Sequence, residues 1–298
     1  MRIKNFLIVM LTVTYIMGCN SKPVKTALEE RIGSIIDQAE GTFAVAYINL
    51  QNEEDALYIN ADEMFHAAST MKTPVLIEAY KQALEGGFSI TDSIMVHNEF
   101  TSIVDGSTFS VELDRDSGKE MHGKIGQLVS MRDILYDMTI NSGNLSTNLI
   151  IDRLGAENVT NTMRTLGASK IEVLRGVEDM KAFEAGLNNR TSATDLAIMF
   201  KAIANGTIVS QEACDDMIKI LLDQNFREMI PALLPDSVKV AHKTGSITGI
   251  THDSGIVFLP DGSKYVLVIL SKNLADNKIG TQTGALISKE IYDHFVGS

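Results

Sequence analysis

Strand-like segments stand near both ends of this chain, and a long stretch without them separates the two groups. The first group is the pair Thr42–Leu50 and Ala56–Asn60, whose residues alternate with period two on either side of a turn. The second group has three members: Ser237–Ile247, His252–Leu259 and Tyr265–Ser271. A sheet built from these runs must join segments from opposite ends of the chain.

Helical periodicity fills most of the rest. It covers about residues 73–232, with short glycine-bearing connectors, and it also marks Lys25–Ala39 and Gly280–Phe295. We therefore expect an α+β fold of the α/β sandwich type. A five-stranded antiparallel sheet would be flanked by the terminal helices, with an all-α domain inserted between its second and third strands. A ligand cleft is expected where the two parts meet, a common place for such sites.

The first residues have the order of a secretory signal. Arg2 and Lys4 precede the apolar run Phe6–Met17, and Gly18-Cys19 follows it, which is typical of a bacterial lipobox in which Cys19 carries lipid. The alternatives are a plain signal peptide or an anchor helix, for which the run is short. We divide the chain into a lipoprotein signal peptide over 1–19 and one domain over 24–298. Within that domain, a sheet part spans 24–72 and 233–298, and a helical part spans 73–232.

Charge and composition exclude several classes of partner. The formal net charge is −12, and no run of lysine and arginine offers the basic surface that nucleic acid requires. No second apolar segment approaches membrane length, so membrane contact is expected only through the lipid. The six histidines form no His-x-x-x-His pair and no Cys-x-x-Cys occurs, so we expect no metal site and no cofactor. With Cys19 lipidated, Cys214 has no partner, and the domain is expected to fold without a disulfide.

A candidate nucleophile stands at the head of the amphipathic run Thr70–Leu84. In Ser69-Thr70-Met71-Lys72 a hydroxyl and an amine lie one helical turn apart, at the end where backbone N–H groups point outward. A neutral Lys72 could take the Ser69 proton, and the helix dipole would favour the anion that forms. The same spacing also occurs at ordinary solvated helix starts, so the assignment needs support from elsewhere in the chain.

Two further motifs follow in order. Ser142-Gly143-Asn144 comes after the helical stretch Met131–Ile140, and Lys243-Thr244-Gly245 ends a strand-like run. Ser-x-Asn is common, and Ser271-Lys272-Asn273 is a second copy, whereas Lys-Thr-Gly is rarer. With all three motifs in this order, the chain resembles the penicillin-recognising serine hydrolases, and the class A serine β-lactamase family in particular, over about residues 30–295.

The resemblance implies a β-lactamase/transpeptidase-like fold and a serine β-lactamase, a hydrolase acting on cyclic amides. Ser69 would attack the lactam carbonyl and form an acyl-enzyme, with the backbone N–H groups of Ser69 and Ser246 as the oxyanion hole. Lys72 would share proton handling, and Ser142 would relay a proton to the departing lactam nitrogen.

Substrate contacts are implied in the same way. Asn144 would hydrogen-bond the substrate's side-chain amide, and Lys243 with Thr244, next to Gly245, would bind its carboxylate. The neighbouring histidines, His66 and His242, are expected to be packed or hydrogen-bonding residues rather than catalysts.

Two glutamates compete to activate the water that hydrolyses the acyl-enzyme. Glu184 opens Glu-Ala-Gly-Leu-Asn, which copies the family's Glu-x-x-Leu-Asn signature, whereas Glu178 copies it poorly. Spacing favours Glu178, which lies 36 positions after Ser142, close to the family's usual separation. We choose Glu178 and keep Glu184 as the alternative.

The chain also departs from the family. Gly143 stands where the family usually has aspartate, so a side chain that braces the cleft is expected to be missing. Residues 100–124 are longer than a typical class A chain has between its first two motifs, and they form either a substrate-contact loop or an inert surface hairpin.

Three functions remain open. The first is a lipid-anchored, monomeric serine β-lactamase exported to the periplasm or cell envelope, where it would confer antibiotic resistance. The second is a related peptidase, esterase or penicillin-binding protein with another acyl substrate, such as a peptidoglycan-like one, and slow deacylation. The third is a non-catalytic lactam- or peptidoglycan-binding lipoprotein, which would have no need of the full catalytic set.

Overall fold

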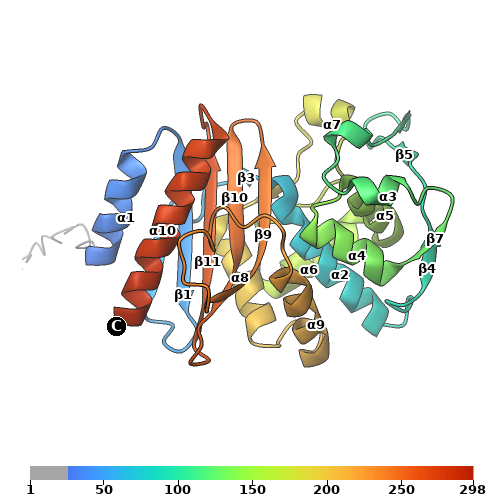
Figure 1. The fold of residues 1–298 in the computed structure, drawn as a ribbon. Helices are drawn as coiled ribbons and strands as arrows, with labels where there is room; N and C mark the ends of the chain where they lie inside the picture. The colour runs from blue at the N-terminus through green and yellow to red at the C-terminus, as the bar shows by residue number, and fades with distance from the viewer. Residues whose placement is uncertain (1–25, 298) are drawn as a thin grey trace, which may run out of the picture.

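The computed structural model describes residues 26–297, so the predicted signal peptide and Cys19 lie outside the described residues. Five strands form one antiparallel sheet in the order β2-β1-β11-β10-β9 (Figure 1). Their bounds are β1 (Thr42–Asn49), β2 (Ala56–Ile59), β9 (Lys239–Ile247), β10 (Ile250–Phe258) and β11 (Lys264–Lys272). β1 pairs with β11, so the two ends of the chain meet inside the sheet. The predicted five-stranded antiparallel sheet is confirmed.

Side chains on the sheet alternate between two hydrophobic cores. On β1, Phe43, Val45 and Tyr47 belong to one core, and Ala44, Ala46 and Ile48 belong to the other. The first core is covered by α1 (Ala27–Asp37) and α10 (Asn277–Gly297), which lie together on one face of the sheet (Figure 1). α8 (Ala193–Ala204) packs on the other face, against β1, β10 and β11. Because both faces are covered, the central strands are apolar almost throughout.

A second, helical part lies beside the β9 edge of the sheet (Figure 1). Its α-helices are α2 (Lys72–Leu84), α3 (Lys119–His122), α4 (Met131–Ile140), α5 (Asn144–Leu154), α6 (Ala156–Leu166), α7 (Met180–Glu184) and α9 (Gln211–Leu222), and its 3₁₀ turns are η1 (Ala68–Met71) and η2 (Leu113–Arg115). Ser130, Ser192 and Ser210 cap α4, α8 and α9 by accepting a backbone N–H from the third residue of each helix. All these helices come from the chain between β2 and β9, as the predicted insertion requires.

Three short strand pairs tie loops to this framework. They are β3 (Phe65–His66) with β8 (Arg190–Thr191), β4 (Ser93–Met95) with β7 (Leu128–Ser130), and β5 (Phe100–Thr101) with β6 (Thr108–Phe109). The first pair joins the chain just before Ser69 to the end of the loop that carries Glu178. The third is a hairpin at the start of the 100–124 segment.

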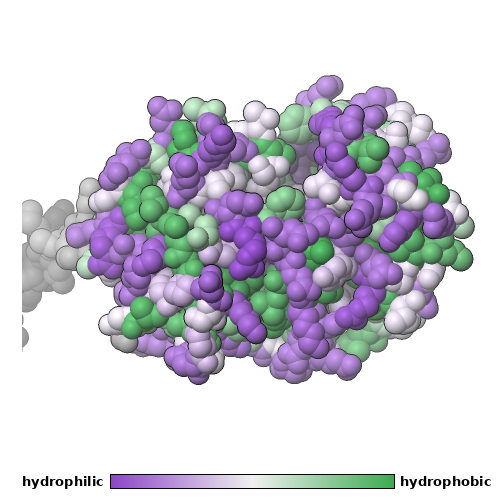
Figure 2. Space-filling model, viewed as in Figure 1, coloured by the Kyte–Doolittle hydropathy of each residue, from purple (hydrophilic) through white to green (hydrophobic). Residues whose placement is uncertain are grey.

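The surface mixes residue types. On the face drawn in Figure 2, hydrophobic residues form separate areas between hydrophilic ones. Within residues 26–297, none of the helices is both long and apolar enough to cross a membrane.

Candidate active site

Ser69 lies on a tight turn rather than in the α-helix expected there. It belongs to the 3₁₀ turn η1, and α2 begins only at Lys72. Ala68, directly before it, has a φ of 44°, a conformation that costs energy for a residue with a side chain. β9 runs close beside this turn, because a Cβ at Gly245 would lie only 3.0 Å from the backbone nitrogen of Ser69. Glycine therefore allows the strand carrying Ser246 to lie against the nucleophile.

Lys72 is completely buried and directed at the second motif. Its ammonium donates to the backbone oxygen of Ser142 at 2.6 Å and to Oδ1 of Asn144 at 3.0 Å, and it lies 3.4 Å from the Ser142 hydroxyl. Within the described residues, no hydrogen bond joins its amine to the Ser69 hydroxyl in this resting state. Burial lowers the pKa of Lys72 to about 7, although the charges of Asp116, Asp137 and Glu178 raise it. A large fraction of the amine is therefore unprotonated near neutral pH, as a general base requires.

The Ser142 hydroxyl lies between two lysines. Nζ of Lys243 donates to it at 3.0 Å, and Nζ of Lys72 lies farther away, at 3.4 Å. Lys243 is also completely buried, and its pKa is lowered well below the usual value by burial and by the neighbouring charge of Lys72. Ser142 itself has a φ of 56°, so its backbone is held in the left-handed region. This placement suits a hydroxyl that passes protons.

Asn144 connects the lysine to a glutamate. Its Oδ1 accepts from Lys72, and its Nδ2 donates to Oε1 of Glu178 at 2.7 Å. Glu178 has a φ of 64°. By contrast, Glu184 is exposed at the end of α7 and does not line the pocket. The structure thus brings Glu178 to the predicted site and leaves Glu184 outside it.

The loop that carries Glu178 is fastened to α5. Asn148 accepts from the backbone N–H of Val177 at 2.6 Å and donates to the backbone oxygen of Val177 at 2.9 Å. Arg175, which is 7% exposed, donates to the backbone oxygens of Leu187 and Gly176. Sequence reasoning did not find Asn148, although it lies one helical turn after Asn144 and therefore on the same face of the helix.

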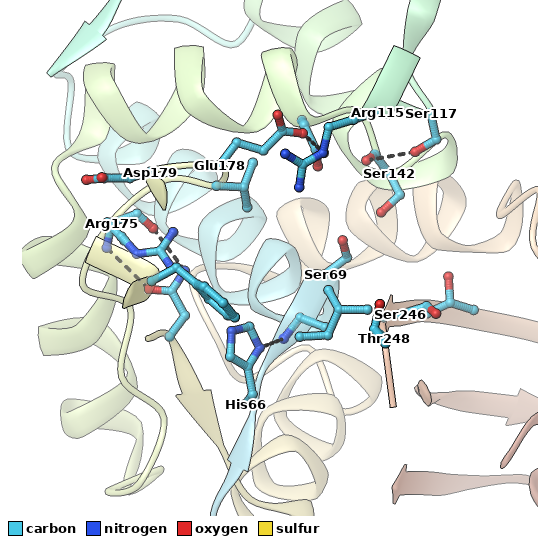
Figure 3. Close-up of a pocket in the computed structure, with 18 of the residues that line it drawn as sticks. His66, Ser69, Arg115, Ser117, Ser142, Arg175, Glu178, Asp179, Ser246 and Thr248 are labelled. Carbon is cyan, nitrogen blue, oxygen red and sulfur yellow. Dashed lines mark hydrogen bonds between the residues drawn. The ribbon is translucent and has the colours of Figure 1, made fainter. Parts of the chain in front are cut away.

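These groups surround a cavity of about 700 Å³. In Figure 3, Ser69 lies centrally, with Ser142, Arg115 and Glu178 on one side and His66 and Ser246 on others. The predicted residues that line it are Ser69, Ser142, Asn144, Glu178, Thr244, Gly245 and Ser246. Lys72 and Lys243 reach the same groups from within the protein. Among residues 26–297, no three or more His, Cys, Asp or Glu side chains are placed to hold a metal ion.

The two histidines next to the motifs have different places. His66 lines the pocket, where its Nδ1 accepts from the backbone N–H of Ala68, and burial followed by the charge of Arg175 lowers its pKa. His242 is fully buried, with its Nδ1 2.8 Å from Asp253, and does not line the pocket. Within residues 26–297, the hydrogen bonds of these two side chains go to Ala68 and Asp253, and none goes to Ser69.

The 100–124 segment enters the site with residues that motif reasoning did not assign. Arg115 and Ser117 line the cavity, and the Ser117 hydroxyl donates to the backbone oxygen of Ser142 at 3.2 Å. The segment therefore contains a hairpin, β5–β6, and also a part that contacts the pocket. The unusual length of this segment was the one feature of the sequence that pointed to a contact with the site.

Comparison with known proteins agrees with this geometry. A model of the β-lactamase enzyme family matches residues 27–295. The chain belongs to the β-lactamase enzyme family. The predicted family and the predicted class of enzyme, a serine β-lactamase, are thereby confirmed, whereas the roles of single residues stay predictions.

This β-lactamase family member is similar along most of its length to named proteins and to solved structures. The extended-spectrum β-lactamase PER-1 of Pseudomonas aeruginosa is 24% identical over 259 residues, covering 84% of this chain and 81% of that protein. The β-lactamase structure from Chitinophaga pinensis has a TM-score of 0.78 at 24% identity, covering 90% of this chain and 99% of that one. A variant of PBP-A, solved as an acyl-enzyme complex with penicillin G, has a TM-score of 0.76 at 25% identity, covering 91% of this chain and 97% of that one.

Proposed function

We propose that this protein hydrolyses β-lactams through an acyl-enzyme on Ser69, which a water activated by Glu178 then releases. The observation that carries the proposal is the contact of one amide, that of Asn144, with both Lys72 and Glu178. The group that assists acylation and the group that assists deacylation are thereby held beside one cavity that Ser69 lines.

In the acylation step, neutral Lys72 accepts the Ser69 proton, directly or through Ser142, as the hydroxyl adds to the lactam carbonyl. The oxyanion is stabilised by the backbone N–H groups of Ser69 and Ser246, on adjacent elements. The C–N bond then breaks, and Ser142 passes a proton to the lactam nitrogen. Because the pKa of Lys72 is about 7, this step should slow as pH falls below 7 and the amine becomes protonated.

In the deacylation step, Glu178 accepts a proton from a water molecule as the water oxygen adds to the ester carbonyl. The ester C–O bond to Ser69 then breaks, and the Ser69 oxygen takes up the proton that Glu178 had accepted, which restores the free enzyme. The Asn144 amide orients the Glu178 carboxylate, and Asn148 holds its loop. A positioned general base accelerates such a step about 10²–10⁴-fold.

Substrate recognition uses the rest of the cavity. Asn144 would bind the amide of the substrate's side chain, and Lys243, Thr244 and Ser246 would bind its carboxylate. An anionic substrate near Lys243 favours the protonated amine and so counteracts the effect of burial. The net charge of −12 does not oppose this binding, because the local charge in the cleft governs the encounter.

Intact-protein mass spectrometry after mixing with a penicillin, followed over time, tests the proposal. A transient adduct on the wild-type protein is the expected result. A lasting adduct would favour the second candidate, a penicillin-binding protein with slow deacylation, for which the similarity to PBP-A in its penicillin complex is the supporting observation. Absence of any adduct would contradict both.

Lys243→Ala is expected to lower kcat/KM by about 10- to 100-fold for lactams that bear the carboxylate, because one charge-assisted hydrogen bond contributes about 1.5–3 kcal/mol. Lactam esters without that charge should lose much less. Lys239→Ala, an exposed residue at the start of the same strand, is the control. Equal losses on acids and esters would mean that Lys243 acts only through the Ser142 hydroxyl that it contacts.

The cellular place of the protein is also a proposal. We assign residues 1–19 to a lipoprotein signal peptide and 24–298 to a monomeric domain held at the bacterial cell envelope by lipid on Cys19. Cys19→Ser is expected to move the protein from the detergent phase to the soluble or unprocessed fraction in phase partitioning. Unchanged partitioning would contradict the lipobox assignment.

A further inference from the structure

The helix that presents Asn144 begins without a cap of its own. α5 starts at Asn144, its N-cap position is Gly143, and no side chain at that position accepts a hydrogen bond. The first backbone N–H groups of a helix need acceptors from elsewhere, and the positive end of the helix dipole favours an anion there.

Asp116, from the 100–124 segment, supplies that anion. Its Oδ1 accepts from the backbone N–H of Asn144 at 2.7 Å, and its Oδ2 accepts from that of Leu145 at 2.9 Å. Gly118 donates a third backbone hydrogen bond at 2.8 Å, and Nε2 of His122 lies 2.9 Å from Oδ2. Asp116 is 1% exposed. Burial alone would raise its pKa, but these hydrogen bonds hold the pKa below its usual value.

Packing explains why the carboxylate that accepts from the first N–H groups of α5 comes from Asp116 and not from a side chain at position 143. A Cβ at Gly143 would lie 2.2 Å from Oδ2 of Asp137, and a Cβ at Gly118 would lie 2.7 Å from the same atom. Asp137 is fixed there by the Ser146 hydroxyl at 2.5 Å. An aspartate at position 143 would therefore collide with a carboxylate already in place. A carboxylate does brace the start of α5, and it comes from Asp116, between η2 and α3, rather than from position 143.

We propose that Asp116 is a positioning residue of the active site, which holds the first turn of α5 so that the Asn144 amide reaches Lys72 and Glu178 together. This inference rests on the proposed function for its kinetic consequences, but not for its structural ones. It also assigns a role to the long segment before the second motif, which carries the brace.

Two consequences distinguish positioning from a merely structural cap. First, Asn144 contacts the groups assigned to both chemical steps, so acylation and deacylation should slow together. Second, the charged groups that face Lys72 are Asp116, Asp137, Glu178 and Lys243. Removing the negative charge of Asp116 lowers the pKa of Lys72 further, so the acid limb of kcat/KM should move to lower pH.

The test compares Asp116→Asn with Asp55→Asn. Asparagine keeps the size of the side chain, but its NH₂ group cannot accept a hydrogen bond, so one of the backbone N–H groups of Asn144 and Leu145 loses its acceptor. Asp55 is a matched control, because it accepts from Tyr47 and Asn49 and lies 2.8 Å from His294, on terminal helix α10. The measurements are amide hydrogen exchange at Asn144 and Leu145 in the free protein, and acylation and deacylation rates with a penicillin over a range of pH.

We expect Asp116→Asn to speed exchange at these amides at least tenfold and to slow both chemical steps by about 10- to 100-fold, the scale of a small misplacement of a catalytic group. Its acid limb should shift to lower pH, and Asp55→Asn should change none of these. Unchanged exchange, or loss of stability with unchanged rates and pH profile, would overturn the proposal. If the wild-type protein does not react with penicillin, the proposed function fails, yet hydrogen exchange still decides whether Asp116 holds the helix.

A second variant covers the case in which Asp116→Asn does not fold. His122→Ala removes one of the four donors to Asp116 and leaves the helix contacts in place. It should speed amide exchange at Asn144 and Leu145 severalfold and slow acylation and deacylation severalfold. No change in this variant, with Asp116→Asn unfolded, would reduce Asp116 to a structural residue and overturn the proposal.

Discussion

Ser69→Ala is expected to abolish the covalent adduct with penicillin and to lower turnover by about 10⁶-fold, the scale seen when a serine nucleophile is removed from a hydrolase. The reason is that no other hydroxyl is proposed to form a bond with substrate, and Ser69 lines the cavity on a turn against which β9 packs. Intact-protein mass spectrometry and a lactam hydrolysis assay measure the two effects.

The fold should survive this change, because alanine fits the same 3₁₀ turn. Ser263→Ala, in the distant turn between β10 and β11, is the control and should acylate normally. A Ser69→Ala protein that still forms the adduct at the wild-type rate would refute the assignment of the nucleophile.

Glu178→Gln is expected to let penicillin acylate Ser69 but to slow release of the adduct by about 10²–10⁴-fold, so that the adduct accumulates. The glutamine carbonyl can still accept from Asn144, as Oε1 of Glu178 does at 2.7 Å, but the amide cannot take a proton from water. Time-resolved mass spectrometry distinguishes a trapped adduct from a fleeting one.

Glu184→Gln provides the matched comparison, since Glu184 is an exposed glutamate six positions later in the chain. It should leave turnover within a few fold. Trapping in the Glu184 variant would show that the Glu-x-x-Leu-Asn signature was the better guide. If neither variant traps the adduct while the wild-type protein turns penicillin over, the base lies elsewhere.

The fold could be predicted from the sequence because each strand of the sheet has a recognisable pattern in its own few residues. Both faces of the sheet are apolar, so β1 and the three strands near the end of the chain are hydrophobic runs rather than the alternating pattern expected for β1. The observed strands begin and end within three residues of the expected ones. Short elements were not seen, such as the 3₁₀ turn at Ser69, because a tight turn followed by a helix has the same periodicity as a longer helix.

That the three motifs lie around one cavity could also be predicted, because each motif is recognisable in the sequence from its residue types and their spacing. The role of Asp116 could not be predicted, since three of its four partners are backbone N–H groups, which nearly every residue has and no sequence pattern encodes. The effect of Asp137 on position 143 was hidden for a similar reason. The Asp137 carboxylate occupies the space that a side chain at position 143 would need, and only the folded structure shows this. The carboxylate that was expected to be missing at Gly143 is replaced by that of Asp116.

The division of this brace between segments limits how family members can be recombined. A chimera that takes its Ser142–Asn144 segment from a relative with aspartate in the middle, but keeps Asp137, would place two carboxylates in one volume. A chimera that shortens the 100–124 segment but keeps Gly143 would leave the start of α5 with no acceptor. Residues 116–146 should therefore be exchanged together. We expect chimeras with one junction inside this range to lose stability or activity, and chimeras with their junctions outside it to fold.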